Sequence, residues 1–226
     1  MRLGGLLKTS ALDFPGRLSA VVFAQGCNFR CPYCHNPDLV PASGRLEDLE
    51  AVMAFLRRRR GLLDGVVVSG GEPTLQPGLP AFLRAVKDLG YLTKLDTNGS
   101  RPAVVARLLA AELVDHVALD LKADPAGYPP ELAPPEQSRP VSETLKLLLA
   151  AGRPVEFRIT CAAPFVDEAV VQAVALAAAG PWTLHLQRCR LERTLAPALL
   201  ARRQPDEAEL LKWRDLARQS LSCEVR

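Results

Sequence analysis

The sequence predicts an α/β fold built on a parallel sheet. Short apolar runs rich in β-branched residues alternate along the chain with segments of helical periodicity. Most of the apolar runs end in glycine or a polar residue, which is typical of strands that lead into loops. Six such strand–helix units in succession favour a parallel sheet with right-handed crossovers. The pattern alone leaves two alternatives, a flat doubly wound sheet and a curved partial barrel.

Each expected strand is a short apolar run, and each expected helix is a longer amphipathic or alanine-rich segment. The strands are expected at Ala20–Ala24, Gly65–Ser69, Leu92–Asp96, His116–Asp120, Val155–Thr160 and Thr183–Gln187. The helices are expected at Leu46–Arg60, Pro77–Leu89, Pro102–Glu112, Ser142–Ala151, Asp167–Ala179 and Asp206–Leu221. Pro102 suits a first helical turn, and Gly90 and Gly152 suit the positions just after a helix end.

Length and composition favour a single domain over residues 1–226. A chain of 226 residues can bury one sizeable core, and an apolar content of 48% is ordinary for a globular protein. No run approaches the roughly 18 apolar residues of a membrane span, and no export signal is evident. The net charge of +3 is too small to indicate nucleic-acid binding. These features predict a cytoplasmic protein with reduced cysteines.

Three cysteines in residues 25–37 carry the strongest functional signal. Cys27, Cys31 and Cys34 have the spacing C-x3-C-x2-C on a loop that directly follows an expected strand. The spacing is too short to thread a fold between the ligands, so we expect the loop to wrap one compact inorganic group. A 4Fe-4S cluster held by only three thiolates keeps one iron open for an outside ligand. An open metal position is typical of a catalytic site.

With Tyr33 just before the last cysteine, this spacing resembles the signature of radical S-adenosylmethionine (SAM) enzymes. The stretches Lys8–Gly16 and Phe23–Pro37 are similar to the activating enzymes of glycyl radical enzymes. They are most similar to activating proteins of anaerobic ribonucleoside-triphosphate reductase. The similarity runs from about residue 8 to about residue 160 and thins out over 161–226. It favours a partial (β/α)6 TIM-like barrel of the radical SAM type.

Polar motifs at the ends of successive expected strands extend the resemblance. Ligands of parallel α/β folds bind at the carboxyl ends of the strands, so we expect these motifs to lie together at that end of the fold. The resemblance implies that the turn after the second strand binds the SAM amino group, and that a lysine and an arginine bind the SAM carboxylate. The expected cofactor-binding residues are Tyr33, Gly70, Gly71, Glu72, Asp96, Thr97, Asn98, Asp120, Lys122 and Arg158.

Two of these residues, Asp96 and Asp120, are carboxylates at the ends of adjacent expected strands. Buried like charges repel, so they need a counter-ion. The resemblance implies a monovalent cation held by Asp96, Thr97 and Asp120 beside SAM. The alternative is an ordinary ion pair between an aspartate and Lys122.

The resemblance also implies a mechanism and partners. The reduced cluster passes one electron to SAM, and the resulting 5′-deoxyadenosyl radical removes a hydrogen atom from a glycine Cα of another protein. No catalytic side chain is expected beyond the cluster and SAM. The expected target is a glycyl radical enzyme, with anaerobic ribonucleotide reductase favoured over pyruvate formate-lyase or a related lyase. A low-potential donor such as flavodoxin or ferredoxin is expected to supply the electron.

Two other functions stay open. The cysteine spacing and the G-G-E-P turn also occur in radical SAM enzymes that act on small molecules, such as 7-carboxy-7-deazaguanine synthase. In the second alternative, the three cysteines and His35 hold zinc in a binding module. In the leading hypothesis His35 instead faces solvent or supports the cluster ligands.

Three parts of the chain lie outside these motifs. The proline-rich segment 123–140 is expected to be extended and not helical, and to act as a connector, a lid or a docking loop. Cys161, Cys189 and Cys223 are widely separated, so we expect them to be small buried residues without metal. The part 161–226 departs most from the relatives, which leaves an adenine contact by His185 open.

Overall fold

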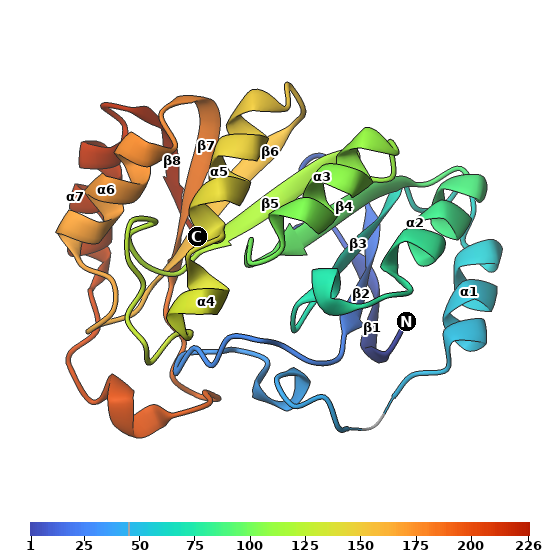
Figure 1. Ribbon diagram of the computed structural model, residues 1–226, viewed down its shortest axis with the longest axis horizontal. Coiled ribbons are helices and arrows are strands. Elements are labelled where there is room, and N and C mark those ends of the chain that lie inside the picture. The colour runs from blue at the N-terminus through green and yellow to red at the C-terminus, as the bar shows by residue number, and fades with distance from the viewer. Residues whose placement is uncertain (45) are drawn as a thin grey trace. The chain divides into compact units, whose positions relative to one another are not determined.

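The structure is a computed structural model that describes residues 1–44 and 46–226. The chain divides into two compact units (Figure 1). Unit 1 comprises Met1–Asn28, Asp38–Thr97 and Ala103–Val117, and unit 2 comprises Phe29–Pro37, Asn98–Pro102 and Ala118–Arg226. The expectation of a single domain over residues 1–226 stays a prediction.

Unit 1 contains the first four strands. They are β1 (Leu3–Ser10), β2 (Ser19–Ala24), β3 (Gly65–Gly70) and β4 (Leu92–Thr97). β1 is antiparallel to β2, whereas β2, β3 and β4 run parallel. The helices are α1 (Leu49–Arg58), α2 (Leu79–Asp88) and most of α3 (Pro102–Ala110), and α2 packs against β4. The apolar residues of β2 and β3 are almost completely buried except for the half-buried Phe23, as is usual for parallel strands covered by helices.

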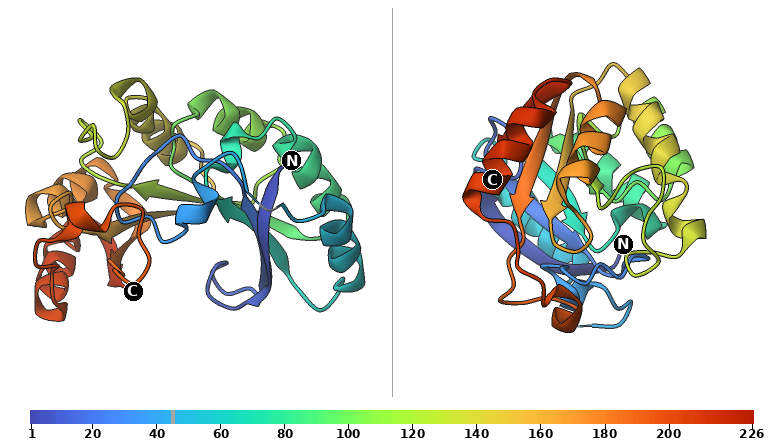
Figure 2. Two further views of the ribbon diagram at one scale, coloured as in Figure 1. Left: turned by 90° about the horizontal axis from the view of Figure 1, so that it is seen from below. Right: turned by 90° about the vertical axis from the view of Figure 1, so that its left-hand side faces the viewer.

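Unit 2 contains most of β5 (His116–Leu121), which begins in unit 1, and three further strands. These are β6 (Val155–Cys161), β7 (Gly180–Arg188) and β8 (Leu221–Val225), and they run parallel. The helices are α4 (Pro135–Ser138), α5 (Val141–Ala150), α6 (Glu168–Ala177) and α7 (Glu207–Ala217). Figure 2 shows that the helices of each unit lie on one face of its strands. Short 3-10 turns are found at Pro37–Leu39, Pro73–Leu75 and Pro197–Leu200.

The order of hydrogen-bonded strands runs from β1 to β8, so the sheet formed by the described residues is open. The predicted α/β class with a mainly parallel sheet is therefore confirmed. The six predicted strands and six predicted helices are all present. Their bounds shift by a few residues because caps and not periodicity set the ends. For example, α1 begins at Leu49 and not at Leu46, since the Asp48 side chain accepts hydrogen bonds from the next turn.

Three elements differ from the prediction. β1 was not predicted because Gly4 and Gly5 interrupt its apolar pattern. β8 was also not predicted, and its first residue, Leu221, was placed at the end of the last helix, which in fact ends at Ala217. The segment 123–140 was predicted not to be helical, but it contains the short helix α4. This helix starts at Pro135, where a missing N–H costs nothing in the first turn.

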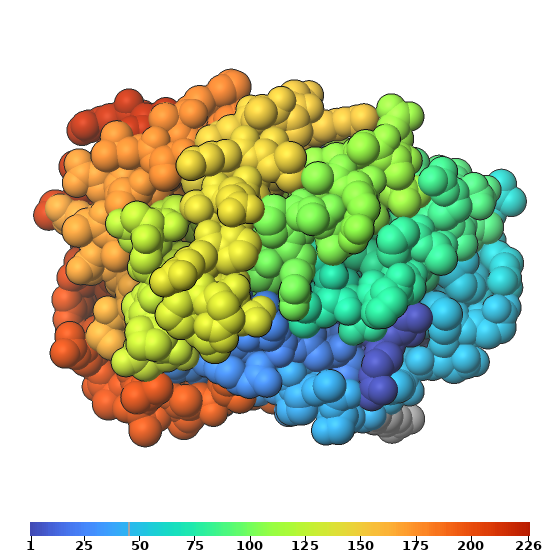
Figure 3. Space-filling view, viewed as in Figure 1, coloured from blue at the N-terminus to red at the C-terminus, as the bar shows by residue number. Residues whose placement is uncertain are grey.

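The proline-rich segment lies at the surface of unit 2, where it is coloured yellow-green in Figure 3. It is nevertheless anchored, because the side chains of Leu132 and Ala133 are almost fully buried. None of the described helices is long and apolar enough to span a membrane.

Candidate functional site

In unit 1, Cys27 lies on the loop that leaves β2. The Gly26 and Cys27 N–H groups donate to the carbonyl oxygens of Leu39 and Val40 at 2.8 and 3.0 Å. The turn after β3 packs directly on this loop, because the Glu72 N–H donates to the Gly26 carbonyl oxygen at 2.8 Å. A Cβ on Gly71 would collide with that same carbonyl group. Gly71 thus lets two backbone segments meet beside Cys27, a use that the sequence did not reveal.

The carboxylate of Glu72 is completely buried and held by hydroxyl groups. Its Oε1 accepts hydrogen bonds from the Thr74 N–H at 3.0 Å, from the Thr74 hydroxyl group and from the Thr97 hydroxyl group at 2.7 Å. Thr97 is the last residue of β4, so these bonds join the turn after β3 to the end of β4. Three donors on one oxygen fix the orientation of the carboxylate before any ligand binds.

Asp96 has a buried counter-ion that sequence reasoning missed. The Lys94 Nζ lies 2.7 Å from the Asp96 Oδ1, and these side chains are 0% and 5% exposed. Residues two apart in a strand point to the same face, so the pattern Lys-x-Asp at the end of a predicted strand could have indicated this pair. A buried carboxylate requires a compensating charge, and Lys94 supplies one.

Cys31 and Cys34 lie in unit 2 on a tight turn, in which the Cys34 N–H donates to the Cys31 carbonyl oxygen at 3.0 Å. Burial raises the pKa of the Cys31 thiol to about 11, although the nearby Lys122 ammonium group acts in the opposite direction. A bound metal would supply the positive charge that keeps such a thiol deprotonated. Cys31 is buried, Cys27 and Cys34 are half-buried, and all three are free thiols.

The turn that carries Cys31 is held by two distant segments of unit 2. The Arg30 N–H donates to the Leu132 carbonyl oxygen in the proline-rich segment at 2.9 Å. The Ala196 N–H donates to the Pro32 carbonyl oxygen at 3.0 Å. Phe29 and Tyr128 also meet edge to face, with ring centroids 6.0 Å apart. The segment 123–140 therefore supports the cysteine loop and does more than connect two elements.

Tyr33 and His35, which flank Cys34, both have partners within unit 2. Tyr33 is buried, and its hydroxyl group donates to the Lys122 carbonyl oxygen at 3.2 Å. The His35 Nε2 accepts a hydrogen bond from the Arg190 N–H at 3.3 Å. Burial lowers the pKa of His35, and the positive charges of Lys122 and Arg190 lower it further.

The zinc alternative requires His35 as a fourth ligand beside the three cysteines. The Nε2 of His35, which this alternative would use as a ligand, accepts a hydrogen bond instead.

Asp120 in β5 brings the two predicted carboxylate-binding cations together. The Arg158 Nε donates to Asp120 Oδ1 at 2.6 Å, and the Lys122 Nζ lies 3.4 Å from Asp120 Oδ2. Burial acts to lower the pKa of Lys122, but Asp120 and the cysteines raise it above its usual value. Two cations around one carboxylate leave a net positive charge, which suits an anionic ligand group.

The last predicted residue, Asn98, has a local role in unit 2. Its side-chain Oδ1 accepts a hydrogen bond from the Ser100 N–H at 3.0 Å, which closes the turn after β4. Such a turn is typical of asparagine. Of the predicted residues, Asp96, Thr97 and Asp120 are among the last two residues of their strands, Arg158 lies in the middle of β6, and Tyr33 lies on the cysteine loop.

Sequence comparison agrees with these features. The model of the radical SAM superfamily matches residues 21–177. The chain belongs to the radical SAM superfamily. Membership implies a 4Fe-4S cluster and SAM as cofactors, and the donor set fits them: three free thiols lie on one short loop, and the Lys122–Arg158 pair can receive a carboxylate.

Curated relatives include activating enzymes. A Methanocaldococcus jannaschii protein, named provisionally as a glycyl-radical enzyme activating enzyme, is 39% identical over 124 residues, which are 53% of this chain and 50% of that protein. The pyruvate formate-lyase-activating enzyme of Clostridium pasteurianum is 37% identical over 134 residues, 56% and 55% of the two chains. The 7-carboxy-7-deazaguanine synthase of Aquifex aeolicus is 33% identical over 85 residues, 38% of each chain. Each match spans about half or less of the relative.

Solved structures support the fold. Streptococcus suis SuiB bound to S-adenosylmethionine superposes with a TM-score of 0.70 at 16% identity, over 91% of this chain and 49% of that chain. A structure of TYW1 with a lysine-pyruvate adduct has a TM-score of 0.59 at 15% identity, over 89% and 73% of the two chains. At such identities the likeness shows a shared fold and nothing about substrates.

Proposed function

We propose that the chain is a radical SAM activase that removes a hydrogen atom from a glycine Cα of a partner glycyl radical enzyme. The observation that carries this proposal is the loop with three thiols in a C-x3-C-x2-C spacing, in a chain that is 37–39% identical over half its length to proteins named as activating enzymes. Three thiolates leave one iron of a cluster open, and an open iron is required for SAM to bind it.

The roles of the residues follow from their chemistry. Cys27, Cys31 and Cys34 would hold the cluster, which together with SAM supplies one-electron cleavage of a carbon–sulfur bond. The rigid carboxylate of Glu72 would accept a hydrogen bond from the SAM amino group. Lys122 and Arg158 would bind the SAM carboxylate, Lys122 as a point charge and Arg158 through its planar fork.

The remaining predicted residues would complete the SAM site. Tyr33 is proposed to lie on the adenine side, where its position is fixed by the hydrogen bond to Lys122. Thr97 would act through Glu72, to which it donates. Asn98 would shape the turn that follows β4.

We leave the monovalent cation out of the proposal. The sequence suggested it because Asp96 and Asp120 need counter-ions. Lys94 now provides one for Asp96 at 2.7 Å, and Arg158 provides one for Asp120 at 2.6 Å. With both carboxylates compensated, no charge argument for a further cation remains.

Among possible partners we favour anaerobic ribonucleotide reductase, because the stretches Lys8–Gly16 and Phe23–Pro37 resemble its activating proteins most. Activation of pyruvate formate-lyase is the nearest alternative, supported by the 37% identity to its activating enzymes. The electron would come from a low-potential donor such as flavodoxin or ferredoxin.

A radical assay tests the proposal. Anaerobically reconstituted protein, SAM and a reductant are mixed with a candidate reductase, and the glycyl radical doublet is sought by EPR spectroscopy. We expect the doublet with the reductase and none with a variant of it whose radical glycine is replaced by alanine. Absence of the doublet with both the reductase and a formate-lyase would refute the activase.

One small-molecule function is supported by a specific match, the 33% identity to 7-carboxy-7-deazaguanine synthase over 85 residues. Turnover of its substrate by the same reconstituted protein, without any glycyl doublet, would favour that second function.

A further inference from the structure

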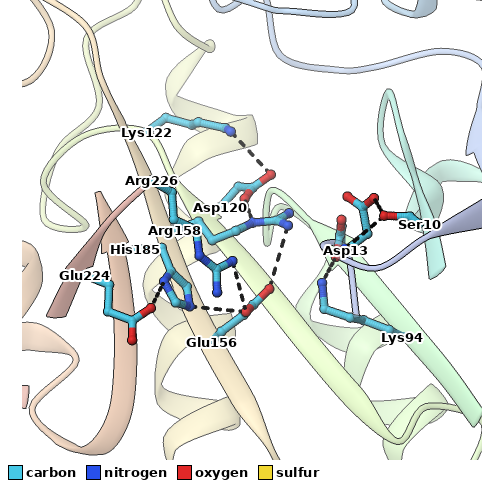
Figure 4. Close-up of polar contacts among 11 residues, drawn as sticks. Ser10, Asp13, Lys94, Asp120, Lys122, Glu156, Arg158, His185, Glu224 and Arg226 are labelled. Carbon is cyan, nitrogen blue, oxygen red and sulfur yellow. Dashed lines mark hydrogen bonds and ion pairs between the residues drawn. The ribbon is translucent and has the colours of Figure 1, made fainter. Parts of the chain in front are cut away.

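A row of charged side chains crosses the strands of unit 2 (Figure 4). It starts at Asp120 on β5 and continues through Arg158 and Glu156 on β6 to His185 on β7 and Glu224 on β8. Arg158 and His185 are direct cross-strand partners, and so are His185 and Glu224. Because these positions are in register, their side chains share one face of the sheet.

Each member of the row lies close to an oppositely charged or chargeable neighbour. Arg158 Nε is 2.6 Å from Asp120 Oδ1, and Arg158 Nη1 is 3.8 Å from Glu156 Oε1. His185 Nε2 is 3.3 Å from Glu156 Oε2, and His185 Nδ1 is 3.4 Å from Glu224 Oε2. The row therefore joins Asp120, beside Lys122, to the edge strand β8.

Burial is greatest in the middle of the row. The side chains of Glu156 and His185 are 5% and 4% exposed, whereas that of Glu224 is 56% exposed. Arg226 reaches Glu156 only at 4.0 Å and is itself 42% exposed. A buried carboxylate is stabilised by close cations, and Arg158 and His185 both contribute to the charge compensation of Glu156.

This dependence sets up a competition for Arg158. The guanidinium group lies between two carboxylates, Asp120 at 2.6 Å and Glu156 at 3.8 Å. A positive charge on His185, 3.3 Å from Glu156 on the other side, would neutralise Glu156 and let Arg158 stay on Asp120. If His185 loses its charge, Glu156 attracts Arg158 more strongly and draws it away from Asp120.

We propose that His185 is a positioning residue: as an imidazolium between Glu156 and Glu224, it neutralises Glu156 and thereby keeps Arg158 on Asp120, in place to bind a ligand carboxylate. The part concerning the ligand rests on the proposed function, in which that ligand is SAM. The proposal also gives His185 a role other than an adenine contact, since both of its ring nitrogens face carboxylates.

The first experiment needs no cofactor. In protein labelled with 15N, the exchange rate of the Arg158 Nε–H is compared between wild type, His185→Gln, Glu156→Gln and the double variant. We expect exchange to be roughly tenfold faster in His185→Gln and to return toward the wild-type rate in the double variant, where no buried charge is left uncompensated. A merely structural histidine would give additive effects and no rescue, and that result would overturn the proposal. His116→Gln, in unit 1, is the matched control and should leave the rate unchanged.

The second experiment measures SAM binding to the reconstituted protein. The charged groups around His185 and its partner Glu156 are Arg158 from β6, Glu224 from β8 and Arg226, which follows β8. His185→Gln should bind SAM roughly tenfold more weakly than wild type, because Arg158 is no longer held on Asp120.

The outcomes of the two experiments separate the two proposals. If wild type binds no SAM but the exchange rates show coupling and rescue, the positioning role stands and the proposed function fails. If wild type binds SAM and His185→Gln binds equally well, the positioning role is refuted and the proposed function stands.

Discussion

Buried carboxylates place the strictest requirements on the residues around them in this chain. Glu72, Asp96 and Glu156 are each 5% exposed or less. Each is compensated within its own unit, Glu72 by hydroxyl and amide donors, Asp96 by Lys94 and Glu156 by cations of the charged row. Since an uncompensated buried charge costs several kcal/mol, these partners stabilise the folded chain.

The Lys94–Asp96 pair gives the first prediction. Replacing Lys94 by methionine keeps the volume but leaves Asp96 buried without this counter-ion, so the free energy of unfolding should fall by about 3–5 kcal/mol. Urea denaturation measures the change, and adding Asp96→Asn should recover part of it. The matched control is Lys146→Met on the exposed face of α5. An equal loss in both single variants would show that the buried pair contributes nothing specific.

The six cysteines give the second prediction. Cys31→Ala should abolish cluster assembly, because two thiolates cannot hold the cluster on this loop. Cys189→Ala should leave the iron content unchanged, since Cys189 lies outside the C-x3-C-x2-C loop. Iron and sulfide analysis after anaerobic reconstitution measures both. A large loss of iron in Cys189→Ala would show that the ligand assignment is incomplete.

At the scale of elements, loops at strand ends are held by contacts between backbones. The turn after β3 and the loop after β2 touch at Gly71 and Gly26. In unit 2, the proline-rich segment and the segment after β7 each bind the cysteine turn through one backbone hydrogen bond. Loops fixed in this way can present ligands with little loss of entropy on binding.

The third prediction concerns the turn after β3. Gly71→Ala should destabilise the protein by about 1–3 kcal/mol, because its Cβ collides with the Gly26 carbonyl group and one backbone segment has to move. The shift should also lower the iron content, since Cys27 follows Gly26. Gly127→Ala is the control, because a Cβ there meets nothing within 4 Å. If both variants retain wild-type stability and iron, the close approach is unimportant.

The fourth prediction concerns Asp115, which joins α2 to the start of β4. Burial acts to raise the pKa of Asp115, but Lys87 at 2.7 Å and hydrogen bonds from Thr93 outweigh it and lower the pKa below its usual value. A carboxyl group with a lowered pKa stabilises the fold above its unfolded pKa of about 3.9. That stabilisation is lost as pH falls through the folded pKa.

Asp115→Asn should therefore lower the free energy of unfolding at pH 7 by about 2 kcal/mol, and should weaken the further loss of stability on acidification. Urea denaturation at pH 7 and at lower pH values measures both effects. The exposed Asp88 at the end of α2 provides the control Asp88→Asn. An acid dependence in Asp115→Asn equal to that of wild type would contradict the prediction.

At the scale of the whole molecule, the spacing of the cysteines along the chain predicts one cluster. Only three of the six are closely spaced, and Cys161, Cys189 and Cys223 are far apart in sequence and partly or fully buried. Burial raises the pKa of Cys161 to about 12 and that of Cys223 to about 11.

The fifth prediction follows from the spacing of the six cysteines along the chain. Anaerobic reconstitution should give about four irons and about four sulfides per chain, the content of a single cluster. Adding SAM should then change the EPR spectrum of the reduced cluster, because one iron is open. A content near eight irons would show a second cluster, and a spectrum unchanged by SAM would contradict an open iron.

The sequence by itself determined the fold class and the chemistry of the cysteine loop. Both could be predicted because they depend on residues close together in the sequence. The alternation of β2 to β7 with helices follows from hydrophobic periodicity over a few residues, and Cys27, Cys31 and Cys34 are neighbours along the chain. It did not reveal β1 and β8, because glycines weaken the apolar pattern of β1 and Leu221 extends that of α7.

Only the tertiary structure decided which charges meet. It paired Asp96 with Lys94, gave Asp120 to Arg158, and set His185 between Glu156 and Glu224. These choices depend on strand register and burial, which bring together residues up to 39 positions apart in the case of His185 and Glu224. The Lys-x-Asp pattern hints at the first pair, but no local pattern encodes the partners from different strands, because the energy of a charge depends on what surrounds it after folding.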